Sequence, residues 1–88
     1  MLENFSEIRQ RGDDYEFGAD AGDKRLVFYV SFKTITEVFE VAPVVESRIV
    51  ALYNSRRAEF SSAAQRAWDA DGHSSHRVRL EQRHFADP

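Results

Sequence analysis

Apolar residues recur at helical spacing along a long stretch in the second half of the chain. At about 100° per residue, these side chains fall in one sector of a helix, with polar and small side chains opposite. The apolar set is Val45, Ile49, Leu52, Tyr53, Phe60, Ala63, Ala64 and Ala67. The pattern predicts one amphipathic helix from Val44 to about Ala70, with Gly72 as its C-terminal signal.

A helix of this length is long for so small a chain. At about 1.5 Å per residue it would measure about 39 Å, whereas a compact domain of this size has a diameter of about 30 Å. We therefore expect either a bend, near Asn54 and Ser55, or an exposed apolar end that packs against a second subunit. The second alternative predicts a homodimer with Tyr53 and Trp68 at its interface.

Two strand-like runs lie between Asp13 and Ser31 and flank a segment rich in glycine and aspartate, Gly18 to Lys24. These residue types suit chain reversals, so the region predicts a β-hairpin. In the first run Tyr15 and Phe17 share a face opposite Glu16. In the second run, the face expected to be buried carries Leu26, Phe28 and Val30.

The segment from Phe32 to Val41 fits two structures. Its β-branched residues favour a strand, whereas a stripe of three apolar residues with Ser31 as a cap favours a helix. The β-branched residues are Thr34, Thr36 and Val38, and the stripe is Phe32, Ile35 and Phe39. We favour a short helix that ends before Pro43, because the residue before a proline avoids helical dihedrals.

The end of the chain adds one more strand. His76 to Leu80 alternates polar and apolar residues, which predicts a strand with Val78 and Leu80 on its inner face. Glu81 to Phe85 would form a last turn that packs Phe85 against the body of the protein.

Composition places these elements in one small folded domain, residues 1–88. The chain is 42% hydrophobic and contains no cysteine, which excludes disulfides and thiolate zinc sites as supports for a thin core. Its N-terminus has an acid where a signal peptide would carry basic residues, and no apolar run is long enough to span a bilayer. We expect a cytoplasmic protein without a membrane segment.

Charge is unevenly distributed. The net charge is −3, with −5 in residues 1–47 and +2 in residues 48–88. An acidic chain of this kind lacks the dense basic face of most duplex-binding domains. The basic C-terminal half nevertheless leaves nucleic acid open as a partner.

Arg56 and Arg57 are adjacent arginines in or beside the apolar stripe of the long helix. In one interpretation their stems cover apolar surface and their heads reach water or an acid such as Glu16 or Glu37. In the other, they form a fork for a phosphate or carboxylate of a ligand.

A second candidate surface is the outer side of the last strand. If Val78 and Leu80 face the core, Arg77 and Arg79 face outward and could lie beside Val27 and Tyr29. An aromatic ring beside arginines on an open sheet can hold single-stranded nucleic acid, or it can be a solvated face with a cation–π contact.

No catalytic motif is recognisable. His73, His76 and His84 have a spacing that is weak as a metal motif, and the acids fall in turns and loops. Neither a nucleophile motif nor a phosphate-binding glycine loop occurs. We expect no enzymatic activity, no metal and no cofactor.

The spacing of single residues resembles a family of short bacterial proteins, domain of unknown function 1488. The matching positions are Val30-Ser31, Tyr53, Arg57, Phe60, Ala64, Trp68, Gly72, Arg77-Val78-Arg79-Leu80 and His84-Phe85. His84 departs from the family pattern, which has an acid there. The resemblance implies an α+β fold in which a small antiparallel three-stranded sheet packs against a short and a long helix, in the order ββααβ. It implies no activity.

Together these features predict a non-enzymatic binding or adaptor module that self-associates through its long helix. The alternative is a nucleic-acid-associated regulatory protein. The candidate interaction residues are Arg56, Arg57, Trp68, Tyr53, Arg77, Arg79 and Tyr29.

Overall fold

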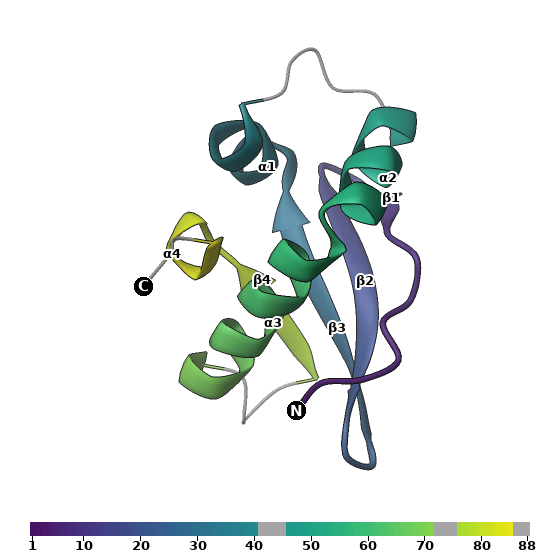
Figure 1. Cartoon of the computed structure of the whole chain (residues 1–88), viewed down its shortest axis with the longest axis vertical. Coiled ribbons are helices and arrows are strands. Elements are labelled where there is room, and N and C mark those ends of the chain that lie inside the picture. The colour runs from purple at the N-terminus through teal and green to yellow at the C-terminus, as the bar shows by residue number, and fades with distance from the viewer. Residues whose placement is uncertain (41–45, 72–75, 86–88) are drawn as a thin grey trace.

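The computed structural model describes residues 1–40, 46–71 and 76–85 of the chain. Its strands are β1 (Arg9–Arg11), β2 (Asp14–Ala21), β3 (Lys24–Ser31) and β4 (Arg77–Leu80). Its helices are α1 (Phe32–Phe39), α2 (Glu46–Ser55), α3 (Arg57–Asp71) and α4 (Gln82–Phe85). In Figure 1, α2 and α3 cross in front of the twisted sheet.

The sheet has four strands in the order β1-β2-β3-β4 and is mixed. β1, β2 and β3 are antiparallel neighbours, whereas β4 pairs parallel to β3. The expected antiparallel three-stranded sheet in the order ββααβ is therefore wrong. β1 has only three residues, all polar and exposed, so it gives no hydrophobic alternation. The direction of β4 depends on how the intervening helices return the chain, which no local pattern encodes.

The predicted hairpin is confirmed, but its turn is shorter than expected. The strands run up to Ala21 and resume at Lys24, so the turn consists of Gly22 and Asp23 alone. Gly22 has a φ of 60°, in the left-handed region that glycine adopts without strain. Gly18 and Asp20 belong to the strand, because their neighbours Phe17 and Ala19 continue the buried alternation.

The short helix is also confirmed. Ser31 is its N-cap, since the hydroxyl oxygen accepts a hydrogen bond from the Thr34 amide at 3.1 Å. The helix ends at Phe39, two residues before the expected end, and Glu40 follows with a φ of 54°. Pro43, the expected cause of that ending, lies outside the described residues.

The single long helix is corrected to two helices separated by Arg56. The chain bends close to Asn54 and Ser55, where a bend was expected, and both residues are weak helix formers. The Ser55 hydroxyl donates to the Leu52 carbonyl, which also accepts from the Arg56 amide at 2.8 Å. The bend is the first of the two expected alternatives. The straight helix whose exposed end motivated a homodimer is therefore not formed. Of the helices described, none is both long and apolar enough to cross a membrane.

An aromatic cluster joins the inner face of the sheet to the helices. The Phe17 ring centroid lies 5.1 Å from that of Tyr53, 5.7 Å from that of Phe28 and 6.2 Å from that of Phe60. All four side chains are buried, as are the predicted inner-face residues of β3 and β4. Phe85 stacks edge-on against Phe60 at 5.5 Å, so the last turn packs as expected.

Phe60→Ala should lower the free energy of unfolding by about 3 to 5 kcal/mol, because the lost ring leaves a cavity between β2 and α2. Urea unfolding followed by circular dichroism measures the change. Phe32→Ala is the control, since that ring is 41% exposed and its loss should cost less than about 1 kcal/mol. Equal losses for the two variants would contradict the position of Phe60 in the core.

Candidate functional site

The sheet face opposite the helices carries mostly charged side chains. They alternate along each strand with the core residues, because successive side chains of a strand point to opposite faces. We call Arg9, Arg11, Glu16, Val27, Tyr29, Arg77 and Arg79 together the arginine face. The helices of the described chain pack on the other face, against Phe17 and Phe28. The arginine face is thus the side of the sheet that is turned to solvent.

One row of this face crosses the whole sheet. Arg9 on β1 is opposite Glu16 on β2, Glu16 is opposite Tyr29 on β3, and Tyr29 is opposite Arg79 on β4. Neighbouring strands lie about 4.8 Å apart, so the Cα atoms at the two ends of the row are about 14 Å apart. The register therefore places arginines at both ends of the row and an aromatic ring between them.

Glu16 lies beneath three guanidinium groups. Its carboxylate oxygens are 3.7 Å from Arg9 Nη2, 3.5 Å from Arg11 Nη1 and 3.6 Å from Arg77 Nη1. The Glu16 side chain is only 7% exposed, whereas those of Arg9, Arg11 and Arg77 are 72, 68 and 55% exposed. The negative charge is buried and the positive charges are at the surface, so the face is positive towards solvent.

Tyr29 lies under arginines as well. The Arg77 guanidinium carbon is 5.0 Å from the Tyr29 ring centroid, and that of Arg79 is 5.9 Å away. Both distances fall in the range of cation–π attraction. The Arg77 side chain, from β4, therefore lies over the Tyr29 ring on β3 and extends towards Glu16 on β2. These contacts confirm that Arg77, Arg79 and Tyr29 lie together, as predicted.

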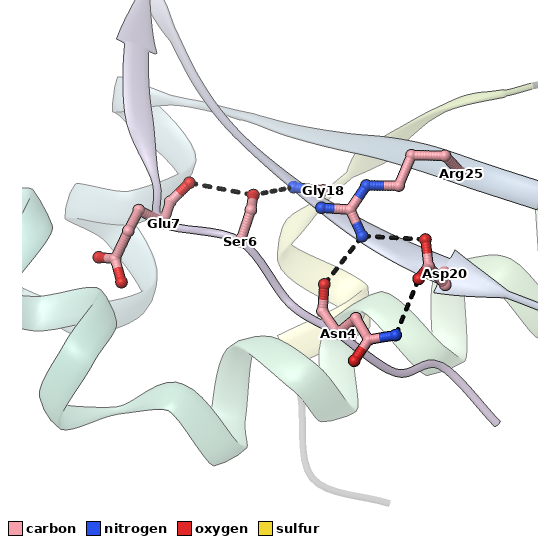
Figure 2. A network of polar contacts seen from close by, with 6 residues as sticks. All are labelled: Asn4, Ser6, Glu7, Gly18, Asp20 and Arg25. Carbon is pink, nitrogen blue, oxygen red and sulfur yellow. Dashed lines mark hydrogen bonds and ion pairs between the residues drawn. The ribbon is translucent and has the colours of Figure 1, made fainter.

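The N-terminal segment is held at one end of the sheet by a separate polar network (Figure 2). Arg25 donates from Nη1 to the Asn4 carbonyl at 2.8 Å and to Asp20 Oδ1 at 3.0 Å. Hydrogen bonds from Asn4 and Arg25 hold the pKa of Asp20 below its usual value. Arg25 crosses Gly18, where a Cβ atom would lie 2.9 Å from its Nη2. Arg25 thus has a structural role.

A hollow of about 430 Å³ adjoins the arginine face near Gly18, where the lack of a Cβ atom leaves room for the Arg25 guanidinium. The residues around it include Ser6, Arg9, Glu16, Gly18, Arg25 and Val27. Gly18 pairs with Val27, and Val27 pairs with Arg77, so the hollow lies one row away from Tyr29.

The helix arginines lie elsewhere and have structural partners. Arg56 pairs with Glu59 at 2.7 Å. Arg57 lies over the Tyr53 ring at 4.2 Å and donates to Asn54 Oδ1 at 2.9 Å. These contacts favour the structural interpretation of both residues over a ligand-binding fork. Glu16, one of the two acids expected to pair with these arginines, belongs to the arginine face instead.

The predicted interaction residues therefore separate into two groups. Tyr53 is buried and Trp68 is half-buried against the core, on the helix side with Arg56 and Arg57. The residues that sequence reasoning missed are Arg9, Arg11 and the central role of Glu16. The available signal was the alternation of Arg9 and Arg11 just before the turn at Gly12, which is too short to predict a strand.

The three histidines do not form a described metal site. His84 is buried, and its Nδ1 accepts a hydrogen bond from the Glu81 amide at 2.9 Å. His76 is exposed, and His73 lies outside the described residues. In residues 1–40, 46–71 and 76–85, no group of three or more histidine or acidic side chains could hold a metal ion.

Glu16→Gln should lower the free energy of unfolding by about 1 to 2 kcal/mol, because it leaves three neighbouring guanidinium groups without their shared counter-charge. The loss should shrink in about 1 M salt, where repulsion between the arginines is screened. Glu59→Gln, which breaks the exposed pair with Arg56 and removes an acid from the first turn of α3, should cost less than about 1 kcal/mol. A salt-independent loss for Glu16→Gln would contradict the electrostatic role of Glu16.

Tyr53→Phe should change the pH dependence of stability. The Tyr53 hydroxyl donates to the Ser6 carbonyl at 2.8 Å, and burial raises the pKa of Tyr53 to about 12, although Arg57 acts in the opposite direction. An unfolded tyrosine titrates near about 10. The stabilisation from the neutral hydroxyl is therefore complete below about pH 10 and is lost as the pH rises to about 12.

At pH 7, the Tyr53→Phe variant should be less stable by about 1 kcal/mol through the lost hydrogen bond. Urea unfolding across this pH range should show the difference from the original protein narrowing above about pH 10. A constant difference up to pH 12 would show that the Tyr53 hydroxyl does not titrate with a raised pKa.

Comparisons with protein-family models, with curated proteins and with solved structures found no match. The resemblance to domain of unknown function 1488 stays a prediction.

Proposed function

We propose that this chain is a non-enzymatic binding module and that the arginine face holds an anionic partner. The observation that carries the proposal is the buried Glu16 carboxylate beneath the exposed guanidinium groups of Arg9, Arg11 and Arg77. Arg79 lies on the same face opposite Tyr29, so four arginines gather on this side of a chain whose net charge is −3. Asp14, opposite Arg11, lies on this side too.

The hydrogen-bonding capacity of this group supports binding. The guanidinium groups of Arg9 and Arg11 alone carry more N–H donors than one carboxylate can accept. Glu16 also restrains the arginines near one another before a partner arrives, which lowers the entropy lost on binding. A partner with several phosphates or carboxylates would match such an array, because arginine pairs well with planar and tetrahedral anions.

The chemistry of arginine supports binding rather than catalysis. Arginine stays protonated in proteins, so it stabilises charge but neither takes nor gives a proton. Among the residues that define the arginine face, Glu16 carries the carboxylate, and its side chain is buried. Two copies of this face would also repel each other, so the proposed partner is an anion and not a second arginine face.

The double variant Arg9→Ser with Arg79→Ser should elute from immobilised heparin at lower salt than the original protein, because two exposed charges leave the proposed surface. The matched control is Arg48→Ser with Arg56→Ser, which removes two arginines from the helix side. Circular dichroism checks that both variants are folded.

Both double variants change the net charge by the same amount. The control should elute at a salt concentration close to that of the original protein and above that of the arginine-face variant. If instead the control loses as much retention as the arginine-face variant, binding follows net charge and the arginine face is not the site.

A further inference from the structure

We propose that the anionic partner of the arginine face is a single-stranded nucleic acid, whose bases stack at Tyr29 and whose phosphates pair with the arginines. This inference rests on the proposed function and specifies its ligand. It is carried by three features of the face: the position of its ring, the hollow beside the ring and the width of the face.

The Tyr29 ring is at the centre of the positive charge. It lies in the row between Glu16 and Arg79, and the guanidinium groups of Arg77 and Arg79 approach its ring. Nucleobases stack both on aromatic rings and on guanidinium planes. Because Arg77 lies over Tyr29, a base would stack on the Arg77 guanidinium above the ring, beside further cations for phosphates.

The hollow at Gly18 adds a place for a base beside this ring. It lies one row from Tyr29 and holds about 430 Å³ between Arg9, Val27 and Arg25. Half-buried Val27 gives the hollow an apolar wall, and Arg9 supplies N–H donors for the ring nitrogens and carbonyl oxygens of a base. A flat heteroaromatic group fits such surroundings better than an aliphatic side chain does.

The width of the face suits several nucleotides. The row from Arg9 to Arg79 spans about 14 Å, and a stacked strand advances about 3.4 Å per nucleotide. About four nucleotides would therefore cross the strands between the outer arginines. This length lies at the low end of the site sizes of single-strand binding folds.

The width of the sheet argues against a duplex. The major groove is about 12 Å wide and admits a helix or a two-stranded ribbon, whereas this face is four strands across. An acidic peptide would pair with the arginines equally well. It has no planar base to stack, however, so it would make no use of Tyr29.

The test measures fluorescence anisotropy of labelled probes with the full chain over a range of salt concentrations. Two probes are single strands: a 15-nucleotide oligothymidylate and an abasic deoxyribose phosphate oligomer of equal charge. The other two are a polyglutamate peptide and a 15-base-pair DNA duplex. The protein variants are Tyr29→Leu, Tyr29→Phe and the two arginine pairs already described. Phe32→Leu is a control for the loss of an exposed ring.

Oligothymidylate should bind tighter than the other three probes, with a log–log salt slope of about −2 to −3 for three or four phosphate contacts. Tyr29→Leu should weaken that binding about 5- to 100-fold and leave the slope unchanged. Tyr29→Phe and Phe32→Leu should bind as the original protein does. Arg9→Ser with Arg79→Ser should reduce the slope by about 1.4.

Three results would overturn the inference. Equal binding of the oligothymidylate, abasic and polyglutamate probes would show an anion site without base recognition, and the proposed function would stand. Tighter binding of the duplex would show a different docking mode. Binding of oligothymidylate that neither Tyr29→Leu nor the arginine-face variant changes would place the site elsewhere. If no probe binds in a way that depends on Arg9 and Arg79, the proposed function fails as well.

Discussion

The packing of Phe17 determines which side chains reach each face of the sheet. Its ring meets β3, α2 and α3 at once through Phe28, Tyr53 and Phe60. A slip of one residue in β2 would move this ring to solvent and expose the core, so the register is strongly specified. Because Phe17 is fixed inward, its neighbour Glu16 is fixed on the opposite face. The hydrophobic core thus positions the charge that organises the arginines.

The sequence predicted well the parts of the fold that depend on local pattern. The hairpin has alternating apolar residues, and the short helix has both an apolar stripe and the capping serine, Ser31. β1 and the direction of β4 were missed because they depend on partners far along the chain. β1 consists of Arg9, Gln10 and Arg11, which become a strand only by pairing with β2.

The candidate site was predictable to the same extent. Alternation in the last strand was enough to place Arg77 and Arg79 outward, and the buried face of β3 placed Tyr29 beside them. Arg9 and Arg11 join the arginine face only because β1 pairs with β2. Their part in the site could therefore not be predicted without the sheet. Conversely, Arg56 and Arg57 attracted attention as charges at an apolar stripe. The structure explains them through the helix break and the ring of Tyr53, a packing role that periodicity alone does not distinguish from ligand binding.

The parallel pairing of β3 with β4 has a consequence for the order of assembly. It joins Val27 to Arg77 and Val30 to Leu80, positions far apart along the chain with α1, α2 and α3 between them. Contacts of such long range form late, because closing the intervening loop costs entropy before the contacts can offset it. A partly synthesised chain that ends before Arg77 has Arg9, Arg11 and Tyr29 but lacks the arginines that lie over the ring. The complete surface therefore exists only after the last strand has joined the sheet, which ties the proposed binding to the completion of folding.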